Sequence, residues 1–443
     1  MPWVLLALGV VLAMITIPAL VTVDHWVLLF PAFFVSWLGA GLAAWWLVLI
    51  PVTTATLAAV GGLTAWPGWV GLGLVVAAMA GLLVQWRRAR HGVHAFDSAL
   101  AALEVEPRRR IRRNRRSVML PMSMRTRAVE RIPGIRYAEG AGHRHLLDVY
   151  RPAAGATNAP VLLQIHGGAW MVGTKNTQGR PLMNALARAG WVCVAINYRL
   201  SPRAKHPDHL VDCKLALRWI REHVAEFGGD PTRVVVTGGS AGGHLAAMVG
   251  LTTNDPAFQP GFEDVDTSVT ACIPIYGAYD LEELFTRFGS RVGRRISSSM
   301  GHMVVGASAL DPDGLAAYRE ASPMHRVESG APPFLLLHGT IDNLVPIAQA
   351  RRLASTLQDA GVEAVLVELP GAPHAFDVFH STWGDTSVDG IVRYLSRLPE
   401  LLDGGAPTDA GSVATDPTTM ALASLDVSGQ QVSDAKACRA TGR

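Results

Sequence analysis

The sequence has 443 residues and a formal net charge of +3, from 39 Lys and Arg against 36 Asp and Glu. This near balance excludes a chain that binds polyanions over its whole surface, and the length allows one large domain with an appendage, or two domains. The 4 cysteines are too few and too scattered for a disulfide scaffold or a zinc site.

The N-terminal region has the composition of a membrane anchor. From residue 1 to residue 86 the only formally charged side chain is Asp24. Three stretches are apolar and long enough to cross about 30 Å of hydrocarbon: residues 3–23, 27–50 and 69–86. Residues 51–66 fit either a loop or part of a fourth helix. We therefore expect three or four transmembrane helices in residues 1–90. The first stretch lacks a preceding basic segment, which argues against a cleaved signal peptide.

Arginine is concentrated after the last apolar stretch. Arg87, Arg88 and Arg90 close that stretch, and the run RRRIRRNRR occupies 108–116 within a basic connector at 91–133. The connector suits a solvated linker or a patch attracted to anionic headgroups, at about 1 kcal/mol per basic residue, and we favour the patch. No aromatic residues interleave the arginines, so a nucleic-acid-binding arm is disfavoured. Because arginines beside a span favour the cytoplasmic side, we expect the following domain on the cytoplasmic face.

Residues 134–400 have the pattern of a soluble α/β domain. Apolar runs of strand length alternate with helical stretches: HLLDVY, PVLLQI, WVCVAINY, RVVVTG, VTACIPIY, PFLLLHG and EAVLVEL. Runs that are apolar on both faces predict a doubly wound, mostly parallel sheet covered by helices, one of them at 206–227. Residues 281–327 look like an insertion over the sheet. The tail at 401–443 lacks apolar periodicity and is expected to be disordered.

A candidate nucleophile lies between one predicted strand and a predicted helix. The motif GGSAG at 238–242 follows RVVVT and leads into AGGHLAAMVGL. Glycines permit the cramped turn that lifts a serine hydroxyl above the edge of a sheet, so Ser240 is the candidate nucleophile. The N-terminus of the following helix adds a positive dipole end that suits a developing oxyanion.

A second glycine pair predicts an oxyanion hole. HGGAW at 166–170 directly follows the strand PVLLQI, and acyl transfer needs backbone donors aimed at the carbonyl oxygen as it becomes negative. The expected donors are the amides of Gly167 or Gly168, of Ala169, and of Ala241 after the nucleophile. We expect His166 to hold the loop by a local hydrogen bond rather than to act in catalysis.

Two further motifs supply candidate partners for the serine. Asp342, in HGTID after the strand PFLLL, could orient an imidazole and stabilise its charged form. It could instead serve only as an Asx-type turn residue. His374, in PGAPH after the last strand, is the candidate general base. The chain order Ser, Asp, His, with each residue after a separate strand, favours a catalytic triad.

These motifs together resemble the α/β-hydrolase superfamily, specifically the esterases related to hormone-sensitive lipase. HGGAW, INYRLSP, GGSAGG, HGTIDNLVP and PHAF occur in family order between residues 134 and 399. The resemblance implies Ser240 as nucleophile, Asp342 and His374 as its partners, and the HGG loop as oxyanion hole. The apolar N-terminal third is similar to membrane-anchored esterases of actinobacteria.

Two positions depart from that pattern. The lipase-like branch usually has HGGG, whereas here the fourth position is Ala169, followed by Trp170, a variant closer to kynurenine-formamidase-type hydrolases and feruloyl-type esterases. Gly239 stands where the lipase-like branch usually has an acidic residue. Both departures leave the acyl and alcohol preferences open but do not affect the triad.

The predicted function is hydrolysis of a small-molecule or lipid ester through an acyl-enzyme. Amide hydrolysis by the same fold, of formamidase or peptidase type, stays open, and a catalytically dead membrane scaffold is disfavoured by the complete set of triad candidates. No metal or organic cofactor is implied, and nothing indicates an oligomeric state. The insertion carries adaptable apolar side chains that, with Trp170, predict a pocket for short or medium acyl groups: Met300, Met303, Val304 and Val305.

Overall fold

The computed structural model of the chain describes residues 1–22, 25, 27–105, 126–378 and 380–397. The arginine run at 108–116 and the tail expected to be disordered at 401–443 lie outside the described residues. The N-terminal helices and the α/β domain belong to one compact unit that ends at Leu402.

The apolar N-terminal region forms helices whose boundaries differ from those expected. They are α1 (Pro2–Leu20), α2 (Leu29–Gly41), α3 (Ala43–Leu57, continued to Gly62 by a π-helical turn) and α4 (Trp66–Arg90). The helices long and apolar enough to cross a membrane are Pro2–Leu20, Trp45–Gly62 and Trp66–Leu103.

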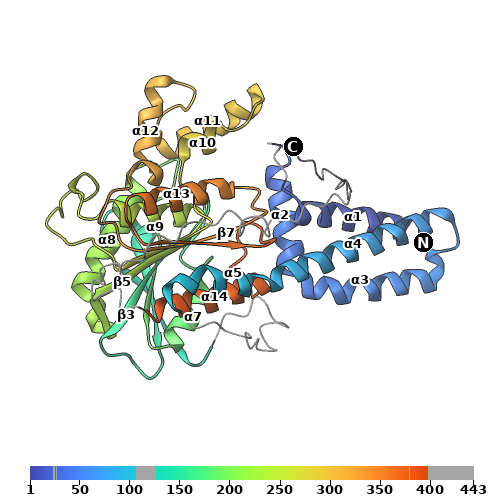
Figure 1. Cartoon of the computed structure of the whole chain (residues 1–443), viewed down its shortest axis with the longest axis horizontal. Coiled ribbons are helices and arrows are strands. Elements are labelled where there is room, and N and C mark those ends of the chain that lie inside the picture. The colour runs from blue at the N-terminus through green and yellow to red at the C-terminus, as the bar shows by residue number, and fades with distance from the viewer. Residues whose placement is uncertain (23–24, 26, 106–125, 379, 398–443) are drawn as a thin grey trace, which may run out of the picture. The chain divides into compact units, whose positions relative to one another are not determined.

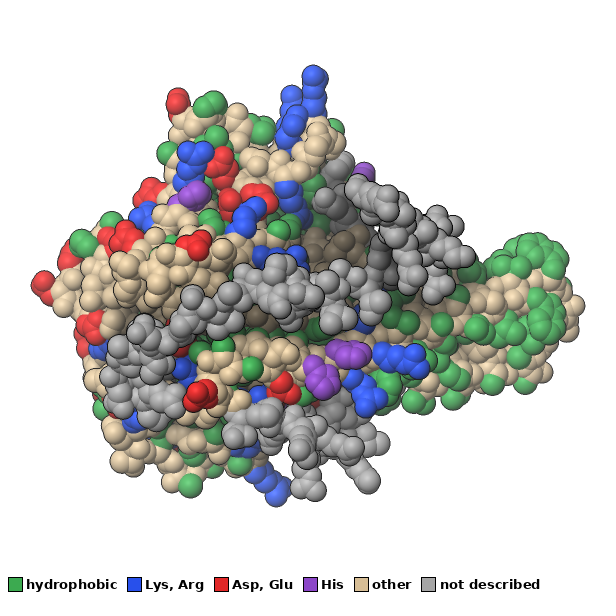
Figure 2. All heavy atoms as spheres, viewed as in Figure 1, with side chains coloured by type: hydrophobic (Ala, Val, Ile, Leu, Met, Phe, Trp, Pro, Cys, Tyr) green, Lys and Arg blue, Asp and Glu red, His purple; other side chains and the backbone are tan. Residues whose placement is uncertain are grey.

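The expected span at 27–50 is therefore wrong as a single helix. It divides at Leu42, whose backbone leaves the helical region (φ −107°, ψ 19°) directly after Gly41. The first piece, α2, has 13 residues and is too short to span a bilayer. The stretch at 51–66, left open between loop and helix, mostly continues α3 through Pro51. Apolar side chains gather over α1, α3 and α4, whereas charges of both signs cover the α/β domain (Figure 2).

The connector expected at 91–133 is partly built into the domain. Helix α5 (Gly92–Leu100) packs on the sheet through Phe96, which is 1% exposed, and strand β1 (Val129–Arg136) pairs with the sheet edge. The domain thus begins before residue 134. The expectation failed because the arginines dominate the composition, whereas the burial of α5 rests on single apolar side chains.

One eight-stranded sheet has the order β1-β2-β4-β3-β5-β6-β7-β8. Strand β1 lies at the sheet edge and was not predicted. All seven predicted strands are present: β2 (Leu146–Pro152), β3 (Ala159–Ile165), β4 (Val192–Ile196), β5 (Gly229–Gly239), β6 (Ala271–Ile275), β7 (Phe334–Gly339) and β8 (Ala364–Leu369). Strand β2 is antiparallel to β1 and β4, and the remaining pairs are parallel. The doubly wound, mostly parallel sheet is confirmed.

Helices cover both faces of the sheet. On one face lie α8 (Asp208–His223), α9 (Ala241–Leu251) and α13 (Ile347–Asp359); on the other lie α5, α7 (Arg180–Arg188) and α14 (Thr382–Leu395) (Figure 1). Alternate residues of β3 face opposite sides of the sheet. Leu163 belongs to the hydrophobic core under α8, α9 and α13, and Leu162 to the core under α5, α7 and α14. The predicted insertion lies between β6 and β7 and forms α10 (Leu281–Thr286), α11 (Arg291–Val305) and α12 (Leu315–Glu320).

Candidate active site

Ser240 stands at a strained turn between β5 and α9. Its backbone has φ 59° and ψ −122°, a region that non-glycine residues rarely adopt and that occurs mainly at functional sites. The flanking glycines are required by close contacts. A β-carbon at Gly238 would lie 2.4 Å from the carbonyl oxygen of Gly242, and one at Gly242 would lie 2.2 Å from that of Ile165. The sharp turn is thus imposed by packing, and it turns Ser240 toward a pocket.

The HGGAW loop lies directly against this turn. A β-carbon at Gly167 would come within 3.1 Å of Ser240 Cβ, and Gly168, Ala169 and Trp170 all have positive φ values. The amide of Gly167 donates to Oε1 of Gln178 at 2.6 Å and is therefore engaged. Within the described part of the chain, the amides of Gly168, Ala169 and Ala241 donate no hydrogen bond to a protein acceptor. Of the glycine pair, Gly168 is thus the residue whose amide has no protein acceptor in the described part of the chain.

Asp342 and His374 meet after β7 and β8. Asp342 Oδ2 lies 2.6 Å from His374 Nδ1, and both side chains are almost fully buried. The other oxygen, Oδ1, accepts the amides of Leu344 and Val345 at 2.8 and 2.9 Å. The two roles considered for Asp342, turn residue and histidine partner, therefore coexist in one carboxylate.

The electrostatic surroundings keep Asp342 ionised. Burial alone would raise its pKa, but the charge and hydrogen bond of His374, with a second contact of 3.3 Å from His338 Nε2, hold the pKa well below its usual range. His338 Nε2 also lies 3.0 Å from the carbonyl oxygen of Val345. His338 thus contacts both the carboxylate of Asp342 and the turn that follows it.

Aromatic side chains that the motifs did not predict surround His374. The ring of Tyr276 lies 4.6 Å from the imidazole, centroid to centroid, and its hydroxyl bonds to the carboxylate of Asp377. A β-carbon at Gly239 would lie 2.7 Å from the same hydroxyl, so Tyr276 connects His374 to the serine turn. Burial raises the pKa of Asp377, although the Tyr276 hydrogen bond and the His374 charge oppose this. One feature of the sequence points to this pair, the position of Asp377 three residues after His374.

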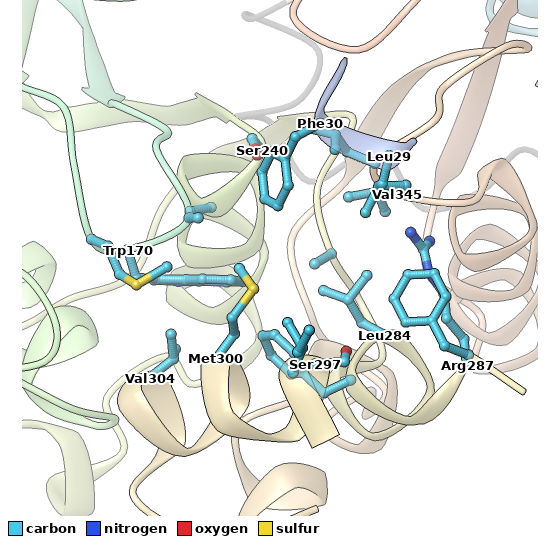
Figure 3. Close-up of a pocket in the computed structure, with 18 of the residues that line it drawn as sticks. Leu29, Phe30, Trp170, Ser240, Leu284, Arg287, Ser297, Met300, Val304 and Val345 are labelled. Carbon is cyan, nitrogen blue, oxygen red and sulfur yellow. The ribbon is translucent and has the colours of Figure 1, made fainter. Parts of the chain in front are cut away.

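The cavity beside Ser240 has a volume of about 130 Å³ and nearly all its walls are apolar (Figure 3). Trp170 forms one wall and is held by a hydrogen bond from its indole nitrogen to His244 Nδ1 at 3.3 Å. Of the side chains expected from the insertion, Met300 and Val304 line the cavity, whereas Met303 and Val305 do not. The remaining lining residues come from the HGGAW loop and the residue after it, the serine turn, the segment after β6, the insertion, the Asp342 turn and α2: Ala169, Met171, Ala241, Ala278, Leu284, Phe285, Arg287, Phe288, Gly293, Ile296, Ser297, Leu344, Val345, Leu29 and Phe30.

His166 has the local role that was expected. Its Nδ1 lies 2.7 Å from the carbonyl oxygen of Gly167, and its ring stacks on Tyr198 with centroids 4.4 Å apart. Burial lowers the pKa of His166 to about 4, so the neutral ring supports the loop. No cluster of three or more His, Cys, Asp or Glu that could hold a metal is present in the described ranges.

Comparison with known proteins agrees with this geometry. Residues 147–357 match the BD-FAE family. Two relatives come from Mycobacterium tuberculosis: the probable carboxylic ester hydrolase LipM is 44% identical over 266 residues, and esterase LipQ is 46% identical over 247 residues. These matches cover 60% and 55% of this chain, and 60% and 57% of the two relatives, so the chain matches little more than half of their length.

Solved structures show the same fold. Inhibited esterase B from Lactobacillus rhamnosis superposes with a TM-score of 0.54 at 22% identity, covering 63% of this chain and 90% of that one. A truncated carbohydrate esterase from gut microbiota gives a TM-score of 0.50 at 22% identity, with coverage of 62% and 95%. The α/β domain of this chain therefore has the α/β-hydrolase fold that its motifs predicted, and its sequence is similar to those of mycobacterial esterases.

Proposed function

We propose that this chain is a serine esterase that hydrolyses carboxylic esters through an acyl-enzyme. Ser240 is the nucleophile, His374 the general base and Asp342 the group that orients and stabilises it. The observation that carries the proposal is the 2.6 Å contact between Asp342 and His374, which Tyr276 links to the strained turn of Ser240. Relatives named as esterases support the ester as substrate.

The reaction follows from these positions. His374 Nε2 takes the proton of the Ser240 hydroxyl as its oxygen attacks the ester carbonyl carbon, and Asp342 stabilises the resulting imidazolium through Nδ1. The protonated imidazole then gives the proton to the leaving alcohol, which departs and leaves an acyl-enzyme. Water, deprotonated by His374, attacks the acyl carbon, and the acid is released with Ser240 restored.

The negative oxygen of the tetrahedral intermediates is stabilised by backbone donors. We assign this role to the amides of Gly168, Ala169 and Ala241, because the Gly167 amide is engaged by Gln178. Loss of one such donor typically reduces turnover by about 10²–10³-fold. The acyl group occupies the apolar cavity beside Trp170, Met300 and Val304, whose modest volume suits a short or medium chain.

The N-terminal helices anchor the enzyme in a bilayer. Three of them are long and apolar enough to cross it. The arginines that end α4 favour a cytoplasmic position for the hydrolase domain.

Replacing the nucleophile tests the proposal. Ser240→Ala should lower ester turnover by about 10⁶-fold, because the residual rate then depends on binding and the oxyanion hole alone. Hydrolysis of p-nitrophenyl butyrate by the purified full-length chain measures this. The Ser299→Ala variant, at an exposed position of α11, is the control that should keep wild-type turnover. Turnover by Ser240→Ala within tenfold of wild type would refute the assignment.

Amide hydrolysis is the second candidate on the same machinery. It requires better protonation of a leaving nitrogen. Comparing p-nitrophenyl esters with the matching anilides separates the two activities. Faster Ser240-dependent cleavage of the anilides would replace esterase by amidase as the proposed function.

A further inference from the structure

Helix α2 lies against the candidate active site although it comes from the apolar N-terminal region. Its residues at positions 29, 33 and 37 recur every four residues and so form one stripe along the helix. Leu29 lines the cavity, Phe33 packs edge-on against the His374 ring with centroids 5.8 Å apart, and Trp37 bonds the loop after His374. The candidate triad residues and this stripe are more than 200 positions apart in the sequence.

The contact made by Trp37 holds a strained residue. Its indole nitrogen donates to the carbonyl oxygen of Ala375 at 3.0 Å. Ala375 follows His374 directly and has φ 60°, a conformation that costs free energy for a residue with a β-carbon. Because this turn sets the position of His374, the Trp37 indole, which holds the carbonyl group of Ala375, also holds the imidazole in place. Phe33 packs edge-on against the same imidazole ring.

The neighbouring stripe of α2 connects the cavity to an exposed apolar surface. Phe30 lines the cavity beside Ser240 (Figure 3), yet 45% of it remains exposed. Phe34 and Leu38, one and two turns further along, are 52% and 40% exposed. Apolar side chains thus run without a charged residue from the cavity along the outer face of the helix.

We propose that α2 contributes to the esterase site in two ways. Leu29 and Phe30 form a wall of the acyl pocket, and Phe33 and Trp37 position His374. This inference rests on the proposed serine esterase function and adds the substrate class. The site takes esters with an apolar acyl chain that dissolves in lipid and reaches Ser240 along α2. Phe33 and Trp37 are positioning residues, because they act through His374 and its loop.

The proposed wall of the acyl pocket is tested by replacing Phe30 with a smaller and with a larger side chain. Phe30→Ala should raise, and Phe30→Trp should lower, the ratio of kcat/KM for p-nitrophenyl decanoate to that for butyrate, by about tenfold, as expected when a pocket gains or loses room for methylene groups. The same changes at Val48, an exposed position of α3 outside the cavity lining, should leave the ratio within twofold of wild type. Assays use the full-length chain in detergent micelles.

The positioning role is tested by Trp37→Phe, which removes the indole donor and keeps an aromatic ring. We expect kcat for p-nitrophenyl butyrate to fall about tenfold, with KM within twofold, because a displaced base slows chemistry more than binding. Labelling of Ser240 by a fluorophosphonate should slow in parallel. Trp45→Phe, at an exposed position of α3, is the matched control and should leave kcat unchanged.

The outcomes separate this inference from the proposed function. If wild-type ester hydrolysis does not depend on Ser240, the esterase function itself fails. If hydrolysis depends on Ser240 but both Phe30 variants keep the wild-type chain-length ratio, α2 is not a wall of the pocket. If Trp37→Phe keeps wild-type kcat and labelling rate, α2 does not position His374.

Discussion

Asp342 joins a backbone turn and a buried imidazole through its two oxygens. One oxygen accepts the amides of Leu344 and Val345, and the other contacts His374 and His338. An amide at this position can keep the turn because its oxygen still accepts, but it cannot balance a positive imidazole. In the proposed mechanism the carboxylate acts through its charge, and in the folded chain it contributes both that charge and the geometry of the turn.

This division predicts unequal losses in the triad. His374→Ala should reduce ester turnover about as much as the Ser240 variant, since no other group can take the hydroxyl proton. Asp342→Asn should lower turnover by about 10⁴-fold and leave more activity than either, because the acid orients and stabilises the base without transferring a proton. Steady-state kinetics of the variants measure these losses of turnover. His380, which pairs with Asp385 at 3.0 Å, supplies the control: His380→Ala should stay active.

The same carboxylate predicts how stability depends on pH. Its folded pKa lies below that of the unfolded chain, about 3.9, so its contribution is complete well above that value and is lost as pH falls toward the folded pKa. Asp342→Asn should therefore melt below wild type at pH 6, and the gap should narrow from about pH 4 downward. Thermal unfolding in detergent between pH 6 and pH 3 measures the gap. A gap that is constant with pH would contradict the ionised state of Asp342.

At this scale the sequence identifies the candidates but not their contacts. Ser240, Asp342 and His374 each follow a strand within a local motif, so a local pattern suffices to find them. The bonds from Gln178 to Gly167 and from Tyr276 to Asp377 join residues 11 and 101 positions apart. Such contacts depend on tertiary packing, and nothing in the neighbouring sequence encodes them.

At the scale of elements, the strands were the most predictable part of the fold. Residues on both faces of β4, of most of β3 and of the second half of β5 are buried, so these stretches are largely apolar runs. Strand β1, by contrast, lies at the sheet edge and is mostly exposed, with polar residues along it. Helix α2 was merged with α3 because hydropathy is continuous across Leu42 and does not report the break in the backbone.

Helix α5 belongs to the folded core, although the many arginines around it predict a connector. Phe96 packs so closely on α14 that a β-carbon at Gly390 would lie 2.2 Å from its ring, and Asp97 pairs with Arg393 at 2.8 Å. Phe96→Ala should destabilise the chain by about 3–5 kcal/mol, the usual cost of a cavity of this size. Chemical denaturation in detergent measures this loss, with the exposed Ser98→Ala on the same helix as control. Equal stability of both variants would mean that α5 is not part of the core.

At the scale of the whole molecule, the pairing of α1 and α4 bears on membrane topology. A β-carbon at Gly71 would meet the backbone of Leu5, one at Gly81 would meet Thr16, and Arg88 donates to the carbonyl oxygen of Leu20 at 2.9 Å. Contacts that advance along both helices in the same direction make them parallel. Two parallel spans must be separated by an odd number of crossings, and α3 supplies the one crossing between α1 and α4. Inserted in a bilayer, these helices would cross it three times, while α2 contacts the hydrolase domain through Trp37.

This arrangement gives a prediction for orientation. With three crossings, the N-terminus and the hydrolase domain lie on opposite sides of the membrane. The arginines at the end of α4 favour the cytoplasmic side for the domain, because positive residues beside a span are retained there. A membrane-impermeant protease added to intact cells should therefore remove an epitope tag placed before Met1 and leave the hydrolase domain whole until the cells are lysed. A cytoplasmic reporter protein serves as the control for intact membranes. Digestion of the hydrolase domain without lysis would reverse the orientation, and protection of both ends would require an even number of crossings.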